Sequence, residues 1–262
     1  MKNINRRVAV LIGVFRQYRN WWLWFFNRCG ILDGAKERMI YLRNGLRFYA
    51  RLDLDNLGAI DDVFIRNEYF NIRNIIDDNA IVIDIGANIG AFSTAAAHRA
   101  RGATIFSYEP TPETFSRLQR NIGLNNLKNI NTFQLAVGGK ARETPLFVHP
   151  KNSGANTIVL HQDNPELFKE DGSVVRVITL EDVFLQNNLS HCDFLKMDCE
   201  GAEFEIIAGA SDDLLKKITH IAMEYHRDNK EIKNRLAGLG FDISVVPGSG
   251  TAGLLYADKR NS

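Results

Sequence analysis

The sequence predicts an α/β fold with a mostly parallel, doubly wound sheet of seven strands that ends in an antiparallel hairpin, preceded by a short helical and hairpin extension. From residue 80 onward, short apolar runs alternate with helical patterns, which is typical of a parallel sheet covered by helices. One run, IVIDI at 81–85, leads through a glycine-spaced turn into a helix. The last two strands are joined by PGSG at 247–250, which is too short for a crossover helix, so we expect them to pair antiparallel.

The elements follow from local patterns taken in chain order. In the extension, which we place at 1–55, residues 39–49 alternate around Asn44 and Gly45 and predict a hairpin with a type I′ turn. The following domain is placed at 56–262 and opens with apolar residues at helical spacing over 60–76. Its predicted strands are the apolar runs at 81–85, 104–108, 130–136, 192–197, 218–225, 241–246 and 253–257. Its predicted helices between them are 92–100, 113–122, 180–186, 202–207, 212–216 and 229–239.

The first thirty residues are basic and aromatic. Arginines interrupt the segment well short of the ~20 apolar residues that a membrane span needs, and no cleavage site follows the first apolar run. We expect a helix whose aromatic face packs on the domain or on a second subunit of a homo-oligomer. The alternative is peripheral membrane contact, because arginine and tryptophan together are typical of interfacial helices. The aromatic residues concerned are Trp21, Trp22, Trp24, Phe25 and Phe26.

Composition narrows the functional class. A hydrophobic content of 45% and a charged content of 24% are those of an ordinary globular protein, and a net charge of +1 gives no overall reason to expect nucleic-acid binding. Cys29, Cys192 and Cys199 are an odd number at unrelated spacings, which fits a reducing cytoplasm. No zinc-binding spacing occurs, so no structural metal site is predicted.

The turn after the first core strand, DIGANIG at 84–90, predicts a binding site for S-adenosylmethionine. Its glycines stand in a G-x-x-x-G spacing, which matches neither the dinucleotide fingerprint nor the phosphate-binding P-loop. Asp84 would repel a phosphate but suits an ammonium or sulfonium ligand at the carboxyl edge of the sheet. The residues expected to hold the cofactor here are Asp84, Gly86, Ala87, Asn88 and Gly90.

The next strand ends in Glu109, whose carboxylate is placed to accept hydrogen bonds from both ribose hydroxyls. After the third strand, a long polar segment at 149–173 separates two further apolar runs. Loops of this length in a compact domain are usually functional or mobile, so residues 152–157 are expected either to cover the substrate or to form an ordinary exposed loop.

A second acidic turn follows the strand at 192–197. Asp198 and Glu200 are delivered to the sheet edge there, on a strand expected beside the one that carries Asp84. Clustered carboxylates raise one another's pKa values, which suits proton abstraction. His226, at the end of another central strand and on the same face as Glu224, is an acid or base candidate with a pKa near neutrality.

These motifs, in this order, resemble the FkbM family of methyltransferases. The resemblance covers about residues 60 to 258 and rests on DIGANIG, SYEP, ITLEDVF, LKMDCEGAEFEII and MEYH, at 84–90, 107–110, 178–184, 195–207 and 223–226. It implies a class I methyltransferase fold, S-adenosylmethionine as methyl donor, and an oxygen acceptor on a sugar, a glycan, a glycolipid or a secondary metabolite.

The resemblance also distributes roles among the residues. Ala136 is expected beside the adenine, and the candidate bases are Asp198, Glu200 and His226, in that order. Dependence on Mg²⁺ is a further alternative, because several oxygen ligands are available at this edge. The competing functional hypotheses are a catalytically silent binding protein with this fold, an NAD-dependent sugar-modifying enzyme and a nucleic-acid methyltransferase. The two intact acids at the sheet edge argue against a silent binding protein. The absence of a dinucleotide fingerprint argues against an NAD-dependent enzyme, and the near-neutral net charge argues against a nucleic-acid methyltransferase.

Overall fold

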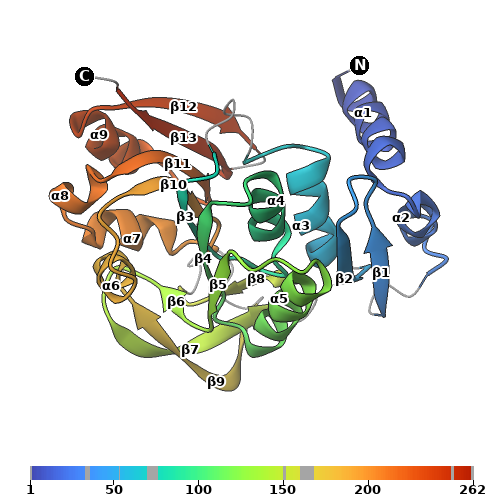
Figure 1. Cartoon of the computed structure of the whole chain (residues 1–262), viewed down its shortest axis with the longest axis horizontal. Coiled ribbons are helices and arrows are strands. Elements are labelled where there is room, and N and C mark those ends of the chain that lie inside the picture. The colour runs from blue at the N-terminus through green and yellow to red at the C-terminus, as the bar shows by residue number, and fades with distance from the viewer. Residues whose placement is uncertain are drawn as a thin grey trace.

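The computed structural model describes residues 2–32, 36–52, 54–69, 76–149, 152–159, 168–248 and 251–260, with the backbone alone at 2–7, 54–55, 152–155 and 171 (Figure 1). Its central sheet has seven strands: β3 (Ile81–Ile85), β4 (Thr104–Tyr108), β5 (Ile130–Phe133), β10 (Cys192–Met197), β11 (Ile218–Tyr225), β12 (Phe241–Pro247) and β13 (Gly253–Lys259). Their order is β12-β13-β11-β10-β3-β4-β5. β13 runs antiparallel to both its neighbours and the other pairs are parallel, which confirms the predicted sheet and its C-terminal hairpin.

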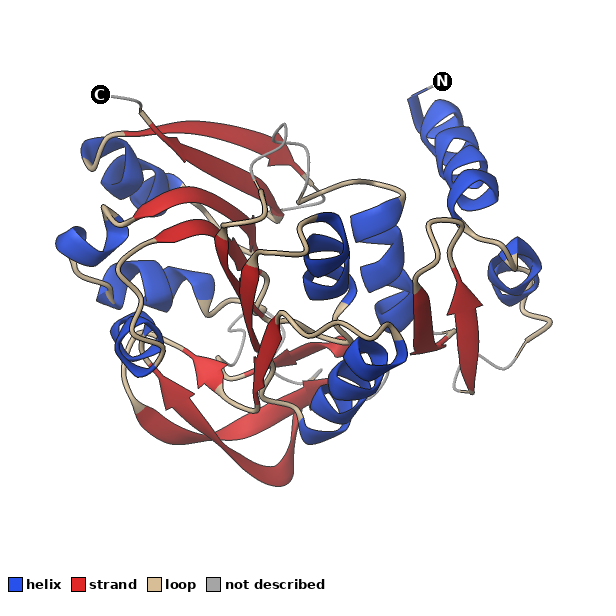
Figure 2. Ribbon diagram, viewed as in Figure 1, coloured by secondary structure: helices blue, strands red, loops and turns tan. Residues whose placement is uncertain are grey.

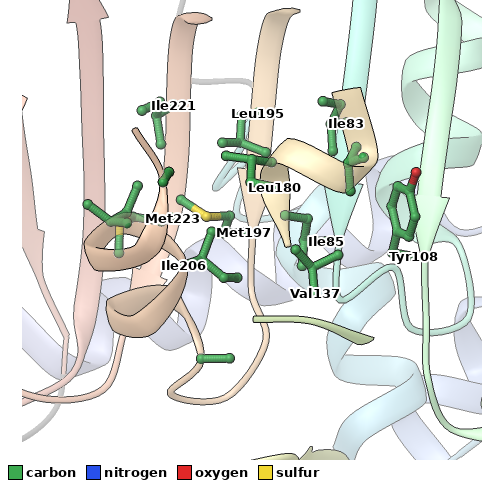
Figure 3. Packing of buried hydrophobic residues seen from close by; sticks show 14 of the residues in the cluster. Ile83, Ile85, Tyr108, Val137, Leu180, Leu195, Met197, Ile206, Ile221 and Met223 are labelled. Atoms are coloured by element: carbon green, nitrogen blue, oxygen red, sulfur yellow. The ribbon is translucent and has the colours of Figure 1, made fainter. Parts of the chain in front are cut away.

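Helices cover both faces of this sheet because its central strands are apolar on both sides. Ile83, Leu195 and Ile221 point to one face, where they share a core with Leu180 of α6 (Leu180–Gln186) and Ile206 of α7 (Glu203–Gly209) (Figure 3). Val82, Phe194 and Ala222 point to the other face, toward α3 and α4. The helices are α3 (Leu54–Phe64), α4 (Ala91–Arg99), α5 (Pro112–Leu124), α6 (Leu180–Gln186), α7 (Glu203–Gly209), α8 (Asp212–Leu215) and α9 (Lys230–Gly238).

The third strand, predicted at 130–136, ends earlier than expected, because the chain leaves the central sheet after Phe133 and enters a second sheet. β5 stops at Phe133, and Ala136 begins a strand that pairs parallel with a distant segment. The polar segment is likewise not only a loop, since residues 152–157 form a strand. The smaller sheet, in the order β6-β9-β7-β8, comprises β6 (Ala136–Val137), β7 (Arg142–His149), β8 (Asn152–Thr157) and β9 (Lys169–Ile178). Asparagine and serine have low strand propensity, so pairing with β7 rather than the local sequence decides β8.

The extension contains two helices and the predicted hairpin: α1 (Lys2–Gln17), α2 (Trp21–Arg28), β1 (Glu37–Tyr41) and β2 (Arg47–Arg51). The type I′ turn is wrong. A type I′ turn needs positive φ at both central residues, whereas here Gly45 has a φ of +94° and Asn44 is not among the residues with positive φ. Leu42 instead pairs with Leu46 around a three-residue loop. The sequence signal therefore located the hairpin but not its turn type.

Helix α3 also differs from the expectation of a helix over 60–76. It begins six residues earlier and ends at Phe64, and Asn67 then has a φ of +56°, which a continuing helix does not allow. Residues 70–75 lie outside the described residues. The extension shares one hydrophobic core with α3 and α4, in which Tyr18, Trp24 and Phe48 are buried. None of the helices described has the length and apolar character that a bilayer span requires.

Figure 2 shows α1 and α2 set apart from the sheet, beyond the hairpin. Of the aromatic residues expected to pack, Trp24 is buried, and its indole N–H donates to the carboxylate of Asp61. Trp22, Phe25 and Phe26 remain 40% to 46% exposed. Trp24 and the partly buried Trp21 therefore pack on the domain as expected, whereas the other three do not, because the short helix α2 can turn only one side to α3. Packing of these three on a second subunit stays a prediction.

Candidate functional site

A cleft opens at the carboxyl ends of β3, β4, β10 and β11, which is where open α/β sheets bind ligands. It contains about 1030 Å³ of space, including the part open to solvent. Three turns form its floor, and α3 and the smaller sheet form its walls. The residues that matter for the argument are Gly86 and Asn88 after β3, Glu109 after β4, Asp198 and Glu200 after β10, Glu224 on β11, Asp62 on α3, and Ala136, Asn156 and Thr157 from the smaller sheet.

Backbone geometry explains the glycines of the first turn. Gly86 has a φ of +75°, and a Cβ atom at this position would lie 1.8 Å from the carbonyl oxygen of Asp198. Only glycine fits there. Gly90, with a φ of +86°, precedes the first residue of α4 and packs on Leu118. The amides of Gly86 and Ala87 donate to the carbonyl of Tyr108, so they hold the turn against β4.

Beneath this turn lies an ion pair whose lysine the sequence analysis missed. Lys196 on β10 stands opposite Asp84 in the parallel register, and its Nζ lies 3.1 Å from Asp84 Oδ1. The same Nζ donates to the carbonyl of Gly86 at 2.7 Å and lies 3.8 Å from Asp198 Oδ2. Burial would lower the pKa of Lys196, but the two aspartates outweigh burial and raise it. The sequence held one signal for this ion pair, namely a single lysine within the otherwise apolar run FLKM.

Asp84 is fully buried and does not line the cleft. Its Oδ2 accepts a hydrogen bond from Ser93, and Ser93 also contacts Ser107 at 2.7 Å. The carboxylate therefore joins β3, β4, β10 and α4 from below. The geometry suits support of the glycine turn, through Lys196, better than direct contact with a ligand.

Glu109 is the acid of the second turn. It is 6% exposed, and both its carboxylate oxygens accept backbone hydrogen bonds, from the amides of Asn88 and Thr111. Burial raises the pKa of Glu109 against the lowering effect of these hydrogen bonds. Because the Asn88 amide is one donor, the carboxylate also fixes the first turn, and both line the cleft together.

Asp198 borders the cleft with a side chain that is 28% exposed. Its Oδ2 accepts a hydrogen bond from the hydroxyl of Tyr69 at 2.9 Å. Asp62, on the facing helix α3, pairs with Arg66, and burial raises the pKa of Asp62 to about 7. Sequence reasoning found neither Tyr69 nor Asp62, because each lies on a segment without a recognisable motif. Asp62 reaches the cleft through the packing of α3, and the buried Tyr69 reaches the side chain of Asp198.

His226 lies in a ring of carboxylates. Its Nε2 is 3.3 Å from Glu200 and 3.9 Å from Glu224, and its Nδ1 is 3.9 Å from the buried Glu203. Glu203 is already engaged, because it accepts the amide hydrogens of Cys199 and Gly201 and so closes the turn before α7. Burial alone would lower the pKa of His226, but the three carboxylates outweigh burial and raise it. Burial, Asp198 and Glu200 raise the pKa of Glu224.

His226 should therefore stabilise the fold most at low pH. Its pKa is higher in the folded than in the unfolded chain, so its contribution is fully present below the ordinary histidine pKa of about 6.5 and is lost as pH rises through the raised value. Urea unfolding of the wild type and His226→Gln across this window measures it. We expect the difference in free energy of unfolding to shrink as pH rises, whereas a constant difference would show that the carboxylates do not hold the imidazolium.

The structure brings most of the predicted site residues together. Those that line the cleft are Gly86, Asn88, Glu109, Ala136, Asp198 and Glu200, and those that lie behind its wall are Asp84, Ala87, Gly90 and His226. The polar strand β8 reaches the same cleft, where Thr157 donates from Oγ1 to the carbonyl of Glu200 at 2.7 Å. Within the described residues, no group of three or more His, Cys, Asp or Glu side chains is arranged to hold a metal ion.

Several known proteins whose sequences match this chain are methyltransferases. The Methyltransferase FkbM domain family matches residues 84–243. Methyltransferase 1 of Beauveria bassiana is 30% identical over 64% of the chain and 74% of its own length. The 31-O-demethyl-FK506 methyltransferase FkbM of Streptomyces tacrolimicus is 24% identical over 62% of the chain and 73% of its own length. The hexuronic acid methyltransferase AglP of Haloferax volcanii is 22% identical over 66% and 69%, respectively.

Proposed function

The chain belongs to the FkbM family of S-adenosylmethionine-dependent methyltransferases, and from this premise we propose that it methylates a hydroxyl oxygen of a sugar, a glycan or glycolipid, or a secondary metabolite. One observation carries the proposal: the glycine turn and Glu109 line the same cleft as the carboxylate of Asp198. The first pair suits the methyl donor, and the carboxylate suits removal of a hydroxyl proton.

The cleft fits S-adenosylmethionine in size and in chemistry. Its volume is within reach of the 300–1,000 Å³ usual for small-molecule sites, given that part of it is open solvent. Glu109 would hold the ribose hydroxyls, and Ala136 with the neighbouring apolar residues of the smaller sheet would lie against the adenine. Gly86 and Asn88 line the cleft, and the amino-acid end of the cofactor would lie beside this turn.

The chain's own task is to position the acceptor and to accept a proton. S-adenosylmethionine, when bound, supplies a methyl group already activated on a sulfonium. Asp198 is the preferred base because it borders the cleft and is ordered by Tyr69. Glu200 is the second candidate. His226 is the weakest as a base, because the surrounding carboxylates keep it protonated near neutral pH, where it would instead orient Glu200.

The acceptor would approach from the side of β8 and α3. Asn156 offers the NH2 group of its side-chain amide there, and Asp62 offers a carboxyl group. Such hydrogen-bonding groups match the hydroxyls of a polyol better than a flat aromatic acceptor. The names of two relatives, which refer to a hexuronic acid and to the 31-O position of FK506, support an oxygen acceptor on a sugar or metabolite.

Glu109→Ala should weaken binding of S-adenosylmethionine by about 1–3 kcal/mol, since two charge-assisted hydrogen bonds to the ribose are lost. Isothermal calorimetry with S-adenosylhomocysteine measures the change. The matched control is Glu113→Ala, an exposed carboxylate on α5 that does not line the cleft. If affinity is unchanged while the melting temperature falls, Glu109 only supports the turn through Asn88 and Thr111.

The direct test of function is methyl transfer from S-adenosylmethionine carrying a tritiated methyl group to a panel of free sugars, glycolipids and hydroxylated metabolites. We expect label in at least one acceptor, in a form stable to mild base as an ether is. Binding of the donor without transfer to any acceptor would favour a silent binding protein. Repeating the assay with EDTA tests the Mg²⁺ alternative, because only a metal-dependent enzyme loses activity.

A further inference from the structure

The outward side of α1 and α2, which we call the N-terminal face, presents apolar side chains to solvent. On α1 they recur at helical spacing on one side of the helix, and on α2 they are aromatic. Each is between 38% and 66% exposed. The residues of the N-terminal face are Val8, Leu11, Ile12 and Phe15 on α1, Trp22, Phe25 and Phe26 on α2, and Ile31 after it.

The two helices form one continuous face with a fixed orientation. The ring of Phe15 lies 4.6 Å from that of Trp21, which in turn lies 6.4 Å from Trp22, so the rows of α1 and α2 meet at the bend. Other side chains already occupy the inward side: Val14 on α1, Tyr18 just after it and Trp24 on α2 are buried in the core, and the last two donate hydrogen bonds to Asp61 on α3. The exposed side chains therefore cannot turn inward to join the core.

Charge distinguishes this face from the rest of the molecule. Residues 2–31 contain one lysine, five arginines and no aspartate or glutamate, whereas the whole chain has a net charge of only +1. The remainder of the chain is therefore net negative. Arg16, Arg19 and Arg28 are exposed beside the apolar rows. Basic residues flanking exposed tryptophan and phenylalanine are the composition of helices that lie in a membrane interface.

We propose that the N-terminal face docks the protein on the surface of an anionic phospholipid bilayer. The apolar rows would enter the boundary between headgroups and acyl chains, and the arginines would contact the lipid phosphates. A second copy of the chain fits less well, because a two-fold contact would bring the same arginines together without a carboxylate in the segment to pair them. The inference goes beyond the proposed function and does not depend on it.

Docking in this way is compatible with the position of the cleft. Helix α3 lies between the two, and it uses different faces for them. Asp61 and, just after the helix, Ile65 contact the extension, through Tyr18 and Gly13, whereas Gly58 and Asp62 line the cleft. The bilayer would thus meet the side of the molecule that carries α1 and α2 in Figure 1. The cleft is lined by other elements, and no described residue of α1 or α2 is among its lining residues.

Flotation of the whole 262-residue chain with lipid vesicles tests the proposal. One set of vesicles is phosphatidylcholine alone and the other contains phosphatidylglycerol in addition. We expect the wild type to float with the anionic vesicles only, and to be released by raised salt, because screening shortens from ~10 Å at 0.1 M to ~3 Å at 1 M ionic strength. The double variant Phe25→Ser with Phe26→Ser should lower the ratio of vesicle-bound to free protein at least about tenfold. Loss of the burial of one phenylalanine side chain already corresponds to a change of about this size in a binding constant.

The matched control is Leu185→Ser, which removes a 76% exposed apolar side chain from α6, outside the N-terminal face, and should float like the wild type. Melting temperatures establish that all variants are folded. No flotation of the wild type at low salt, or equal flotation of the double variant, would overturn the proposal. A dimer in vesicle-free buffer that the double variant abolishes would overturn it too, and would assign the face to a second copy.

Discussion

Asp198→Asn should lower the rate of methyl transfer by about 10²–10⁴-fold, the usual loss when a general base is removed. Asparagine preserves the size of the side chain and still accepts the hydrogen bond from Tyr69, but it cannot take a proton from the acceptor hydroxyl. Affinity for S-adenosylmethionine should change little. Single-turnover assays with saturating donor measure the rate, and calorimetry measures the affinity.

The control for this prediction is Glu224→Gln, which neutralises another carboxylate of the same cleft. The pKa of Glu224 is raised by burial and by Asp198, so Glu224 is the base that would replace Asp198 if our assignment is wrong. We expect Glu224→Gln to retain most activity. A large loss in Glu224→Gln with little loss in Asp198→Asn would reverse the two roles. An equal loss of rate and donor affinity in Asp198→Asn would make Asp198 part of the cofactor site.

Lys196→Met should lower the free energy of unfolding by about 3–5 kcal/mol, the range found when one partner of a buried ion pair is removed. Lys196 is 3% exposed and Asp84 is fully buried, so the substitution leaves a carboxylate without its cation inside the sheet. It also removes the donor to the carbonyl of Gly86, which anchors the glycine turn. Urea unfolding followed by circular dichroism measures the loss.

Two further variants separate the ion pair from the loss of a long side chain. Lys216→Met, at a half-exposed lysine of the surface, should change stability by no more than about 0.5 kcal/mol. Lys196→Met combined with Asp84→Asn should recover most of the lost stability, because no uncompensated charge remains. If the double variant is as unstable as Lys196→Met alone, packing of the lysine side chain, and not its charge, supports the turn.

The sequence alone determined the elements whose pattern is local. The strands at 81–85, 104–108, 192–197 and 218–225 are found with the predicted bounds, because each is a short apolar run closed by a turn residue. The same holds for Gly86, whose positive φ is imposed by the turn, and for the acids that end strands, since parallel strands bring their carboxyl ends to one edge. Helical periodicity and glycine spacing are properties of contiguous residues, so they can be recognised without the fold.

The tertiary structure decided every feature that joins distant parts of the chain. Asp84 was expected to face the ligand, but the register of β3 against β10 sets it beside Lys196, beneath the turn. Ala136 reached the cleft as predicted, yet from a second sheet, because β6 pairs with β9 about forty residues further along the chain. Tyr69 meets Asp198 across 129 residues of sequence. Such contacts depend on strand register and helix packing, which are set by the burial of the whole core and leave no local pattern in the amino-acid sequence.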